Sequence, residues 1–230
     1  MAGMAKRRMM QRLAQWHIWL GWLVGVPLLL WTVSGLVMAL RPIDEVRGDT
    51  LIAAQPPVDP AEIVFPDIGE PVRQVVLVQQ ADGPSWIVTA ATGQRWRYSA
   101  IHGTATPPVI EDEARRIAEA SYAGEARLEG VAYFPADVAP TELGAEVASW
   151  RAHYDDGTNL YIDSMTGEVL AARTGKWRLY DLMWGLHIMD LQTRQNASHP
   201  ILILFAALAV GGVTLGCVLL FRRRKARIRT

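Results

Sequence analysis

The chain has 230 residues, half of them hydrophobic, and 23 basic and 23 acidic side chains give it zero formal net charge at pH 7. The zero conceals a separation of charge, because the two terminal segments hold 10 of the Lys and Arg residues and no acid. The middle of the chain keeps 13 basic against 23 acidic residues, a formal charge of −10. Such an acidic surface excludes nucleic acid as a partner, and the single cysteine, Cys217, excludes an intramolecular disulfide.

Two long apolar segments lie near the ends of the chain. Residues 16–40 contain one ionisable side chain, His17, and residues 200–221 contain no Asp, Glu, Lys, Arg or His. Each segment is long enough to cross the roughly 30 Å core of a lipid bilayer as a helix. The first is expected to be an uncleaved anchor, because it exceeds a signal-peptide core and no small-x-small site follows it.

The basic residues that flank these segments predict the topology. They are Lys6, Arg7, Arg8 and Arg12 before the first segment, and Arg222, Arg223, Arg224, Lys225, Arg227 and Arg229 after the second. Lys and Arg stay on the cytoplasmic side of a membrane, so both termini are expected in the cytoplasm and the roughly 160 residues between the helices outside it. The sequence therefore predicts a two-pass bacterial inner-membrane protein with a periplasmic central domain.

The central region alternates between strand and helix patterns. Strands are predicted at residues 74–79, 85–90, 94–99, 126–134, 149–154 and 160–162, and an acid-capped helix at 111–120. The fold class predicted is an α+β extracytoplasmic domain between two transmembrane helices. The segments are expected to be a basic tail (1–15), a membrane helix (16–40), a linker (41–62), two repeats (63–108 and 109–175), an interfacial amphipathic helix with its turn (176–198), a second membrane helix (199–221) and a second basic tail (222–230).

The two predicted repeats rest on a similarity between the halves of this domain. Trp86 and Trp150 each open a strand, and each is preceded by serine. Tyr98 and Tyr161 follow them at nearly the same spacing, and Gly103 and Gly167 come next in matching turns. The spacing from Trp86 to Trp150 is long for a repeat. It indicates a module that occurs twice rather than a solenoid, which needs three or more shorter repeats.

Several runs resemble known families. Residues 159–170 (NLYIDSMTGEVL), behind a helix and two strands, resemble the PepSY domain, and the first repeat resembles a degenerate copy without a clear helix. Residues 16–21 (WHIWLG), 31–35 (WTVSG) and 181–187 (DLMWGLH) resemble the PepSY-associated transmembrane family. Larger members of that family have four or more membrane helices and include ferric-siderophore reductases thought to use b-type haem. The resemblance implies that a chain with two helices needs a partner or a second copy to complete a haem scaffold.

Three histidines are the candidate cofactor ligands. His17 lies inside the first membrane segment, where ionisable groups are usually functional, and Gly21 and Gly25 follow it at spacings of four. It is expected either to bind haem or to form hydrogen bonds at the cytoplasmic interface. His187 belongs to a stripe of Trp177, Tyr180, Trp184, His187 and Leu191 at spacings of three and four, and it is expected to be either a haem ligand or one residue of an interfacial aromatic belt. His199 precedes Pro200 and either caps the last helix or serves as a second ligand on the outer face.

Helix geometry restricts how these histidines can combine. With a rise of about 1.5 Å per residue, His17 and His187 are expected roughly 30 Å apart, on opposite sides of the bilayer. They cannot ligate one haem within a single chain, so each is expected to pair with its mate in a homodimer or a larger membrane complex. Gly212 and Gly216, with the Gly21 and Gly25 row, offer small-residue faces that suit such a bundle.

The outer domain has no catalytic signature such as HExxH, GxSxG, CxxC or a P-loop. No catalytic residue or metal ligand is therefore assigned, and whether the protein is an enzyme stays open. The favoured function is a component of an electron-transfer or ferric-siderophore-reductase type system, with b-type haem bound in an oligomer. The alternative is a non-enzymatic periplasmic module that binds or inhibits a peptidase or a membrane partner.

Overall fold

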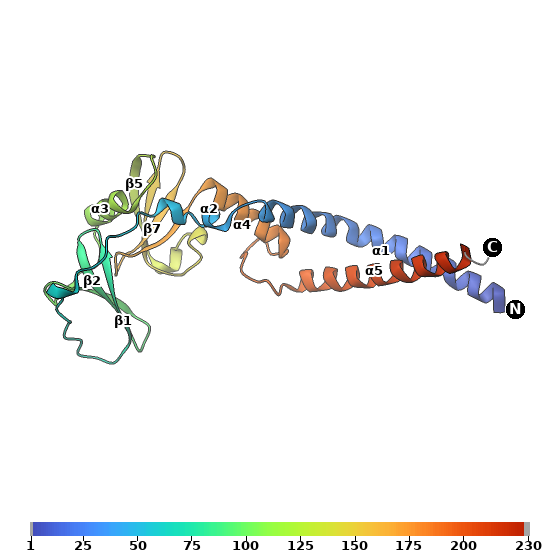
Figure 1. Ribbon diagram of the computed structural model, residues 1–230, viewed down its shortest axis with the longest axis horizontal. Helices are drawn as coiled ribbons and strands as arrows, with labels where there is room; N and C mark the ends of the chain where they lie inside the picture. Colours follow the sequence, from blue (N-terminus) through green and yellow to red (C-terminus); the bar gives the residue numbers. More distant parts are fainter. Residues whose placement is uncertain (1, 228–230) are drawn as a thin grey trace. The chain divides into compact units, whose positions relative to one another are not determined.

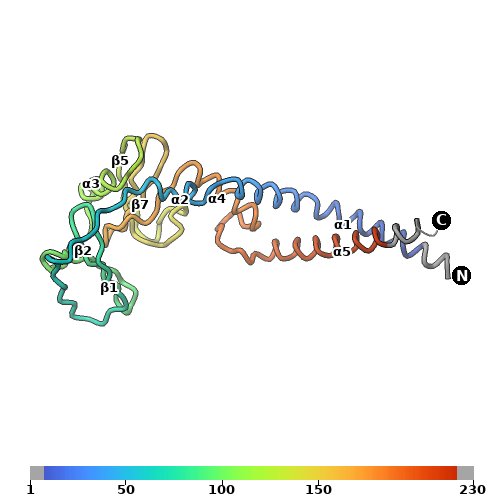
Figure 2. The backbone as a smooth tube through the Cα atoms, viewed as in Figure 1, coloured from blue at the N-terminus to red at the C-terminus, as the bar shows by residue number. Residues whose placement is uncertain are grey.

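The computed structural model describes the backbone of residues 2–227 and the side chains of residues 8–221. The side chains of Lys6 and Arg7, and of the basic residues from Arg222 onward, lie outside the described residues. The chain divides into two compact units. The first unit comprises residues 1–41 and 179–230, and the second comprises residues 42–178. Figures 1 and 2 follow the chain through both units.

The first unit contains the two predicted apolar helices. Helix α1 spans Ala2–Ala39 and helix α5 spans Pro200–Arg227. Within them, Arg8–Ala39 and Pro200–Phe221 are long and apolar enough to cross a membrane. Helix α1 starts well before residue 16, so it includes most of the segment predicted as a basic tail. Helix α4 spans Gly175–His187, and its end is linked to α5 by turns.

Glycines on α5 allow it to pack closely against α1. A Cβ added to Gly212 would lie 3.3 Å from Leu20 Cδ2, and one added to Gly216 would lie 2.9 Å from His17 Cε1. By contrast, a Cβ added to Gly21 or Gly25 would meet nothing within 4 Å. The small-residue face of α5 that was expected to join separate chains is therefore used within the chain, and the row on α1 is open.

Within the described chain, the second unit contains two four-stranded antiparallel sheets, ordered β1-β2-β3-β4 and β5-β6-β7-β8. Two helices accompany them, α2 (Ile43–Arg47) and α3 (Glu111–Ser121). The strands are β1 (Val72–Gln80), β2 (Gly83–Ala90), β3 (Arg95–Ser99), β4 (Ala105–Thr106), β5 (Leu128–Phe134), β6 (Ser149–Tyr154), β7 (Asn159–Asp163) and β8 (Val169–Arg173). Short 3-10 turns occupy Asp49–Leu51, Pro60–Glu62, Ala136–Val138 and Thr141–Leu143.

Helix α3 covers one face of the second sheet and forms the main core. Its first turn carries three acids, which the helix dipole favours, and its apolar stripe is buried. Ala114, Ile117 and Ala118 are at most 3% exposed. The strands opposite contribute Ala152, Tyr154, Leu160, Ile162 and Ala172. The other face of this sheet is covered around Leu143, which packs on Tyr161 and Ala171.

The hydrogen bonds of the first sheet recur in the second at the same sequence offset that separates Trp86 from Trp150. Each sheet has the same turn between its second and third strands and the same turn after its third strand. The corresponding backbone pairs are Ala90 N to Gln94 O with Tyr154 N to Thr158 O, Ser99 N to Thr104 O with Asp163 N to Glu168 O, Gly103 N to Ser99 O with Gly167 N to Asp163 O, and Ala100 N to Pro84 O with Ser164 N to Ala148 O. Both sheets follow one hydrogen-bonding pattern.

Trp86 and Trp150 lie on the second strand of their respective sheets, as the sequence similarity predicts. The tyrosines do not correspond. Tyr98 pairs with Trp86, whereas Trp150 pairs with Ile162. Tyr161 is one position earlier and therefore points to the opposite face of its sheet, because side chains alternate along a strand. The register thus assigns Ile162, not Tyr161, as the counterpart of Tyr98.

The two sheets differ in what precedes their first strand. Val64 N bonds to Ala100 O and Val109 N bonds to Ser164 O, which marks Val64 and Val109 as equivalent positions. In the second sheet, α3 and its loop fill the stretch from Val109 to β5. In the first sheet, only six residues separate Val64 from Pro71, the residue before β1, and they contain no helix. Six extended residues still span about 20 Å, enough to pass the sheet without a helix.

Charged side chains join the two sheets. Arg95 forms ion pairs with Asp163, at 3.3 Å, and with Glu168, both at the turn between β7 and β8. Arg97 is only 3% exposed and bonds to Glu113 of α3 at 2.6 Å. A charge this deeply buried is tolerated only with a partner, because desolvation of an unpaired ion costs several kcal/mol.

The tryptophan hydrogen bonds give a testable difference between the sheets. Trp150 Nε1 donates to Val109 O at 2.9 Å and Trp86 Nε1 donates to Val64 O at 2.8 Å. Val109 is 4% exposed and Val64 is 47% exposed. We expect Trp150→Phe to lower the free energy of unfolding by about 1 to 3 kcal/mol, because it leaves a buried carbonyl unbonded, and Trp86→Phe by less, because water replaces the donor.

Urea unfolding of the detergent-solubilised chain, followed by far-ultraviolet circular dichroism, measures both changes. Trp22→Phe is the control, since this side chain is 79% exposed on α1. If Trp86→Phe lowered the free energy of unfolding more than Trp150→Phe, the conclusion that the Trp150 hydrogen bond is the more important of the two would be wrong.

Candidate functional site

The most constrained histidine is His187, the last residue of α4. Its ring stacks on the indole of Trp31, with centroids 4.8 Å apart and planes inclined by 20°. Its Nδ1 lies 3.1 Å from the backbone oxygen of Trp31 and 3.2 Å from Ser34 Oγ. A Cβ added to Gly35 would approach His187 Cε1 to 3.0 Å. One turn of α1 therefore fixes one face and one edge of this ring.

The other nitrogen of His187, Nε2, forms no hydrogen bond with any residue that the structure describes. A histidine that binds a metal commonly has one ring nitrogen hydrogen-bonded to a carbonyl or carboxylate and the other on the metal. His187 has this arrangement, so its surroundings fit an imidazole ligand. The sequence predicted His187 as a candidate, but not its contacts on α1.

His17 has a different environment. Its ring lies against Gly216 of α5, with Cε1, Nε2 and Nδ1 all within 3.7 Å of a Cβ placed on that glycine. Its Nδ1 is buried and has no hydrogen-bond partner in the described chain. In this arrangement the edge of the imidazole that carries both nitrogens faces the backbone of α5. This position does not favour His17 as an iron ligand, and its role stays a prediction.

His199 lies immediately before α5, where its backbone N–H donates to Asn196 O at 3.2 Å and its carbonyl accepts from Ile203 N. Its Nδ1 is buried without a partner among the described residues. The structure thus places His199 at the start of α5, the capping position. Its ligand role is untested.

The structure does not bring the three candidates together. The α1 residues that contact His187 lie between Trp31 and Gly35, about four to five helical turns after His17. This separation corresponds to about 21 to 27 Å along the helix. Among the described residues, no cluster of three or more His, Cys, Asp or Glu side chains is suited to hold a metal ion.

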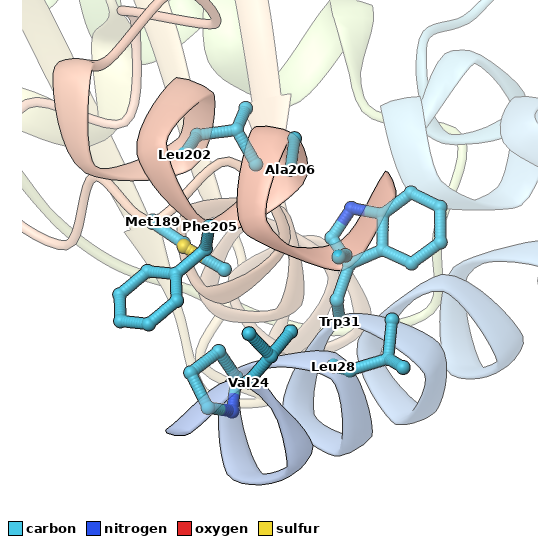
Figure 3. Close-up of a pocket in the computed structure, with 9 residues that line it drawn as sticks. Val24, Leu28, Trp31, Met189, Leu202, Phe205 and Ala206 are labelled. Atoms are coloured by element: carbon cyan, nitrogen blue, oxygen red, sulfur yellow. The ribbon is translucent and has the colours of Figure 1, made fainter. Parts of the chain in front are cut away.

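A pocket between α1 and α5 lies beside Trp31 and was not anticipated from the sequence. It has a volume of about 200 Å³ and an almost wholly apolar lining (Figure 3). The lining residues are Val24, Pro27, Leu28, Trp31, Met189, Leu202, Phe205, Ala206 and Ala209. Trp31 is thus shared between the pocket and the His187 stack, which gives the histidine an apolar neighbourhood.

Comparison with known proteins identifies the family. The family model described as the PepSY-associated TM region matches residues 14–230, nearly the whole chain. The chain belongs to the PepSY-associated transmembrane family. It is accordingly a membrane protein, and α1 and α5 contact the lipid bilayer. The searches of curated proteins and of solved structures gave no match.

Asp190 follows the end of α4, and its side chain forms hydrogen bonds with the turns that lead to α5. It is 5% exposed. Its carboxylate accepts from the hydroxyl and backbone N–H of Thr193 and from Asn196 N. The Thr193 hydroxyl and these backbone donors lower the pKa of Asp190, despite burial, which raises it. Arg194 pairs with Asp181, and its carbonyl accepts from Trp184 Nε1 at 3.0 Å. The turns between α4 and α5 are therefore closely bonded.

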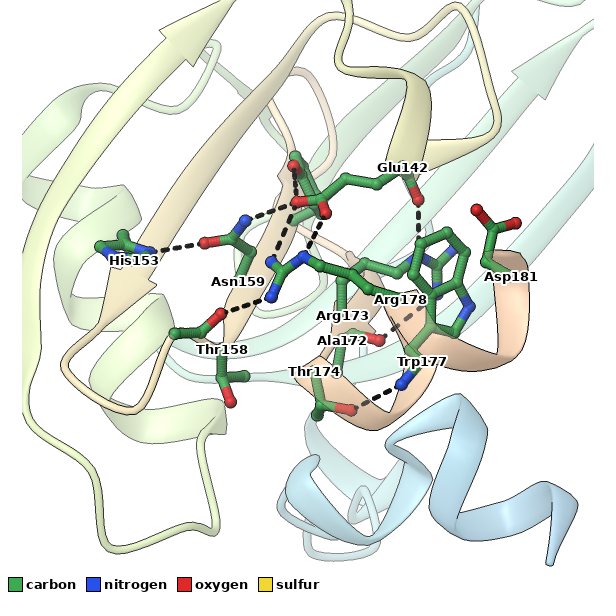
Figure 4. A network of polar contacts seen from close by, with 12 residues as sticks. Glu142, His153, Thr158, Asn159, Ala172, Arg173, Thr174, Trp177, Arg178 and Asp181 are labelled. Atoms are coloured by element: carbon green, nitrogen blue, oxygen red, sulfur yellow. Dashed lines mark hydrogen bonds and ion pairs between the residues drawn. The ribbon is translucent and has the colours of Figure 1, made fainter. Parts of the chain in front are cut away.

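A second polar network surrounds Glu142 in the second unit (Figure 4). The Glu142 carboxylate accepts from Arg178 Nε at 2.9 Å, Tyr161 Oη at 2.6 Å and Asn159 Nδ2. Burial alone would raise the pKa of Glu142, but these hydrogen bonds outweigh it and lower the pKa. Asn159 Oδ1 in turn lies 2.7 Å from His153 Nδ1, which explains the position of that histidine.

This network fastens the first turn of α4 to the second sheet. Arg178 also donates to Gly157 O at 2.8 Å, and Thr174 Oγ1 accepts from Trp177 N at 3.1 Å. The Arg173 guanidinium lies 4.4 Å from the Trp177 ring centre. The aromatic stripe predicted as a membrane-surface belt is thus partly used inside the protein, at Trp177, Trp184 and His187.

The lowered pKa of Glu142 predicts how stability depends on pH. Because the pKa is lower in the folded state than its ordinary value of 4.5, the carboxylate stabilises the fold above that value. The contribution is lost as pH falls through the folded pKa. We expect Glu142→Gln to lower stability at neutral pH and to reduce the loss of stability as the pH falls below the ordinary glutamate pKa of 4.5.

Urea midpoints at several pH values measure this effect. Glu146→Gln, at an exposed position of the same loop, is the matched control. An unchanged slope of stability against pH in Glu142→Gln would show that the network does not depend on the charge of this carboxylate.

Proposed function

We propose that this protein is an inner-membrane component of an electron-transfer or ferric-siderophore-reductase type system, and that it binds b-type haem through His187 in an assembly of at least two chains. The observation that carries the proposal is the His187 ring, held by α1 through one nitrogen with the other nitrogen unpartnered among the described residues. Imidazole is the usual axial ligand of b-type haem. Membership of the family supports the proposal.

The surroundings of His187 suit a flat apolar macrocycle. Its ring is stacked on Trp31, whose indole also lines the apolar pocket between α1 and α5. An apolar shell limits solvent access and raises the influence of nearby dipoles on a bound iron. Haem bound at this position would supply one-electron chemistry, and the chain's own part is to orient the imidazole and keep water away from it.

A second axial ligand must come from elsewhere. His17 lies about 21 to 27 Å from the His187 contacts along α1, and its ring faces Gly216. The open row of Gly21 and Gly25 on α1 leaves room for another helix to approach. We therefore propose a homodimer or a larger membrane complex in which His187 faces the equivalent residue, or another ligand, of a second chain.

Absorption spectra test the haem proposal. Protein purified in detergent from haem-replete cells is expected to show a Soret band that shifts on reduction with dithionite. We expect His187→Ala to lower the haem content per chain by about tenfold or more, because loss of even a supporting contact of a ligand commonly costs tenfold. A pyridine haemochrome assay measures the content.

His102→Ala is the control, because His102 lies in a turn of the second unit. Circular dichroism of each variant checks that it folds. Absence of haem from the wild-type protein would overturn the redox proposal and favour the alternative, a non-enzymatic module in which the PepSY region binds or inhibits a peptidase or a membrane partner. Haem retained in His187→Ala would reject His187 as the ligand.

We also infer that the two sheets are copies of one PepSY-like unit, the first without its helix. The inference is supported by the backbone hydrogen bonds that recur at the Trp86-to-Trp150 offset. The irregularity in the first strand recurs as well, between Val72 and Gln74 in β1 and between Leu128 and Gly130 in β5. A shared bulge at a similar place is unusual in unrelated sheets, since bulges are kept within families.

The basic residues at both ends support a topology with cytoplasmic termini and a periplasmic second unit. In a Cys217→Ser background, a cysteine introduced as Asp137→Cys is expected to react with a membrane-impermeant maleimide in cells with a permeabilised outer membrane. One introduced as Thr230→Cys is expected to react only after the inner membrane is lysed. Labelling of the Thr230→Cys variant before lysis would reverse the assigned orientation.

A further inference from the structure

We infer that Ser34 and the backbone carbonyl of Trp31 hold His187 as the tautomer protonated on Nδ1, so that Nε2 is the atom presented to a ligand, and that Gly35 is required for this ring position. The identity of that ligand rests on the proposed function. The position and tautomer of the ring rest on contacts within the first unit alone.

The hydroxyl of Ser34 decides the direction of the hydrogen bonds. It has one proton, and its Oγ lies 3.0 Å from Trp31 O, a carbonyl oxygen that can only accept. The proton therefore goes to the carbonyl, and the lone pairs of Ser34 Oγ face His187 Nδ1 at 3.2 Å. Ser34 is 1% exposed, so water does not compete for these bonds.

The position of the Trp31 carbonyl leads to the same assignment. Its oxygen lies 3.1 Å from His187 Nδ1. An unprotonated Nδ1 would set its lone pair against two oxygen atoms, one of them the hydroxyl oxygen of the buried Ser34. A protonated Nδ1 donates to both, and a neutral imidazole then carries its lone pair on Nε2. A hydrogen bond on the far nitrogen fixes the tautomer and makes the ligand nitrogen more basic.

Gly35 supplies the space for the ring. A Cβ at this position would lie 3.0 Å from His187 Cε1 and 3.4 Å from Nδ1, and the stacked Trp31 indole limits movement away from it. The membrane helices offer matched controls for both positions. Thr32 Oγ1 bonds to Leu28 O on its own helix, and a Cβ added to Gly211 of α5 meets nothing within 4 Å.

The tautomer is tested on haem-free protein labelled with nitrogen-15 in histidine. Long-range proton–nitrogen correlation spectra distinguish a ring protonated on Nδ1 from one protonated on Nε2. We expect the Nδ1-protonated pattern for His187 in the wild type and in Thr32→Ala. In Ser34→Ala only the Trp31 carbonyl still accepts from Nδ1, so we expect a larger share of the Nε2-protonated ring. An Nε2-protonated ring in the wild type, or an identical spectrum in Ser34→Ala, would overturn the inference.

The consequence for the ligand is tested with haem. We expect Ser34→Ala and Gly35→Ala to weaken haem binding about tenfold and Ser34→Ala to raise the midpoint potential, while Thr32→Ala and Gly211→Ala leave both unchanged. The Nδ1-protonated pattern without any haem binding would uphold the tautomer and reject the proposed function. Haem bound through His187 with no effect of Ser34→Ala would uphold the function and reject the positioning role.

Discussion

The contact between His187 and the Trp31 turn of α1 is the interaction on which the first unit depends. It joins α4 to α1 through a ring stack and two polar contacts at 3.1 and 3.2 Å. Polar groups beside an apolar helix cannot rely on water, so they must be satisfied by the protein. Ser34 and His187 satisfy each other in this way, and the same contact leaves the other imidazole nitrogen, Nε2, without a hydrogen bond among the described residues.

The connection from α4 to α5 keeps this contact in place at a conformational cost. Met189 and Arg194 adopt positive φ values, 56° and 55°, which for residues other than glycine costs about 1 to 3 kcal/mol each. The Asp190 hydrogen bonds and the Asp181–Arg194 ion pair offset that cost. The strained turn directs Met189 toward the apolar pocket (Figure 3). Such strain is commonly found next to functional sites.

Patterns local in the chain predicted much of this architecture. Alternation and turn residues located six strands and α3, and the apolar segments located the membrane helices. Strand β8 was missed because its two buried residues are adjacent, without alternation. The matching of Tyr98 with Tyr161 was wrong by one position, which reverses the face. The contacts of His187 lie on the first helix, at the other end of the sequence, and no spacing rule predicts which helix a side chain meets.

Charged side chains join the two sheets, of which only the second carries a helix on its face in the described chain. In the second sheet α3 buries one face, and its acidic first turn then becomes a surface that can receive Arg97. In the first sheet the six residues after Val64 contain no helix. Three of the ion pairs between the sheets join arginines of β3 to carboxylates of α3 and of the β7–β8 turn, while a longer pair, Arg116 with Asp82 at 3.7 Å, runs the other way. The helix that only the second sheet carries thus supplies both a carboxylate and an arginine to the contact between the sheets.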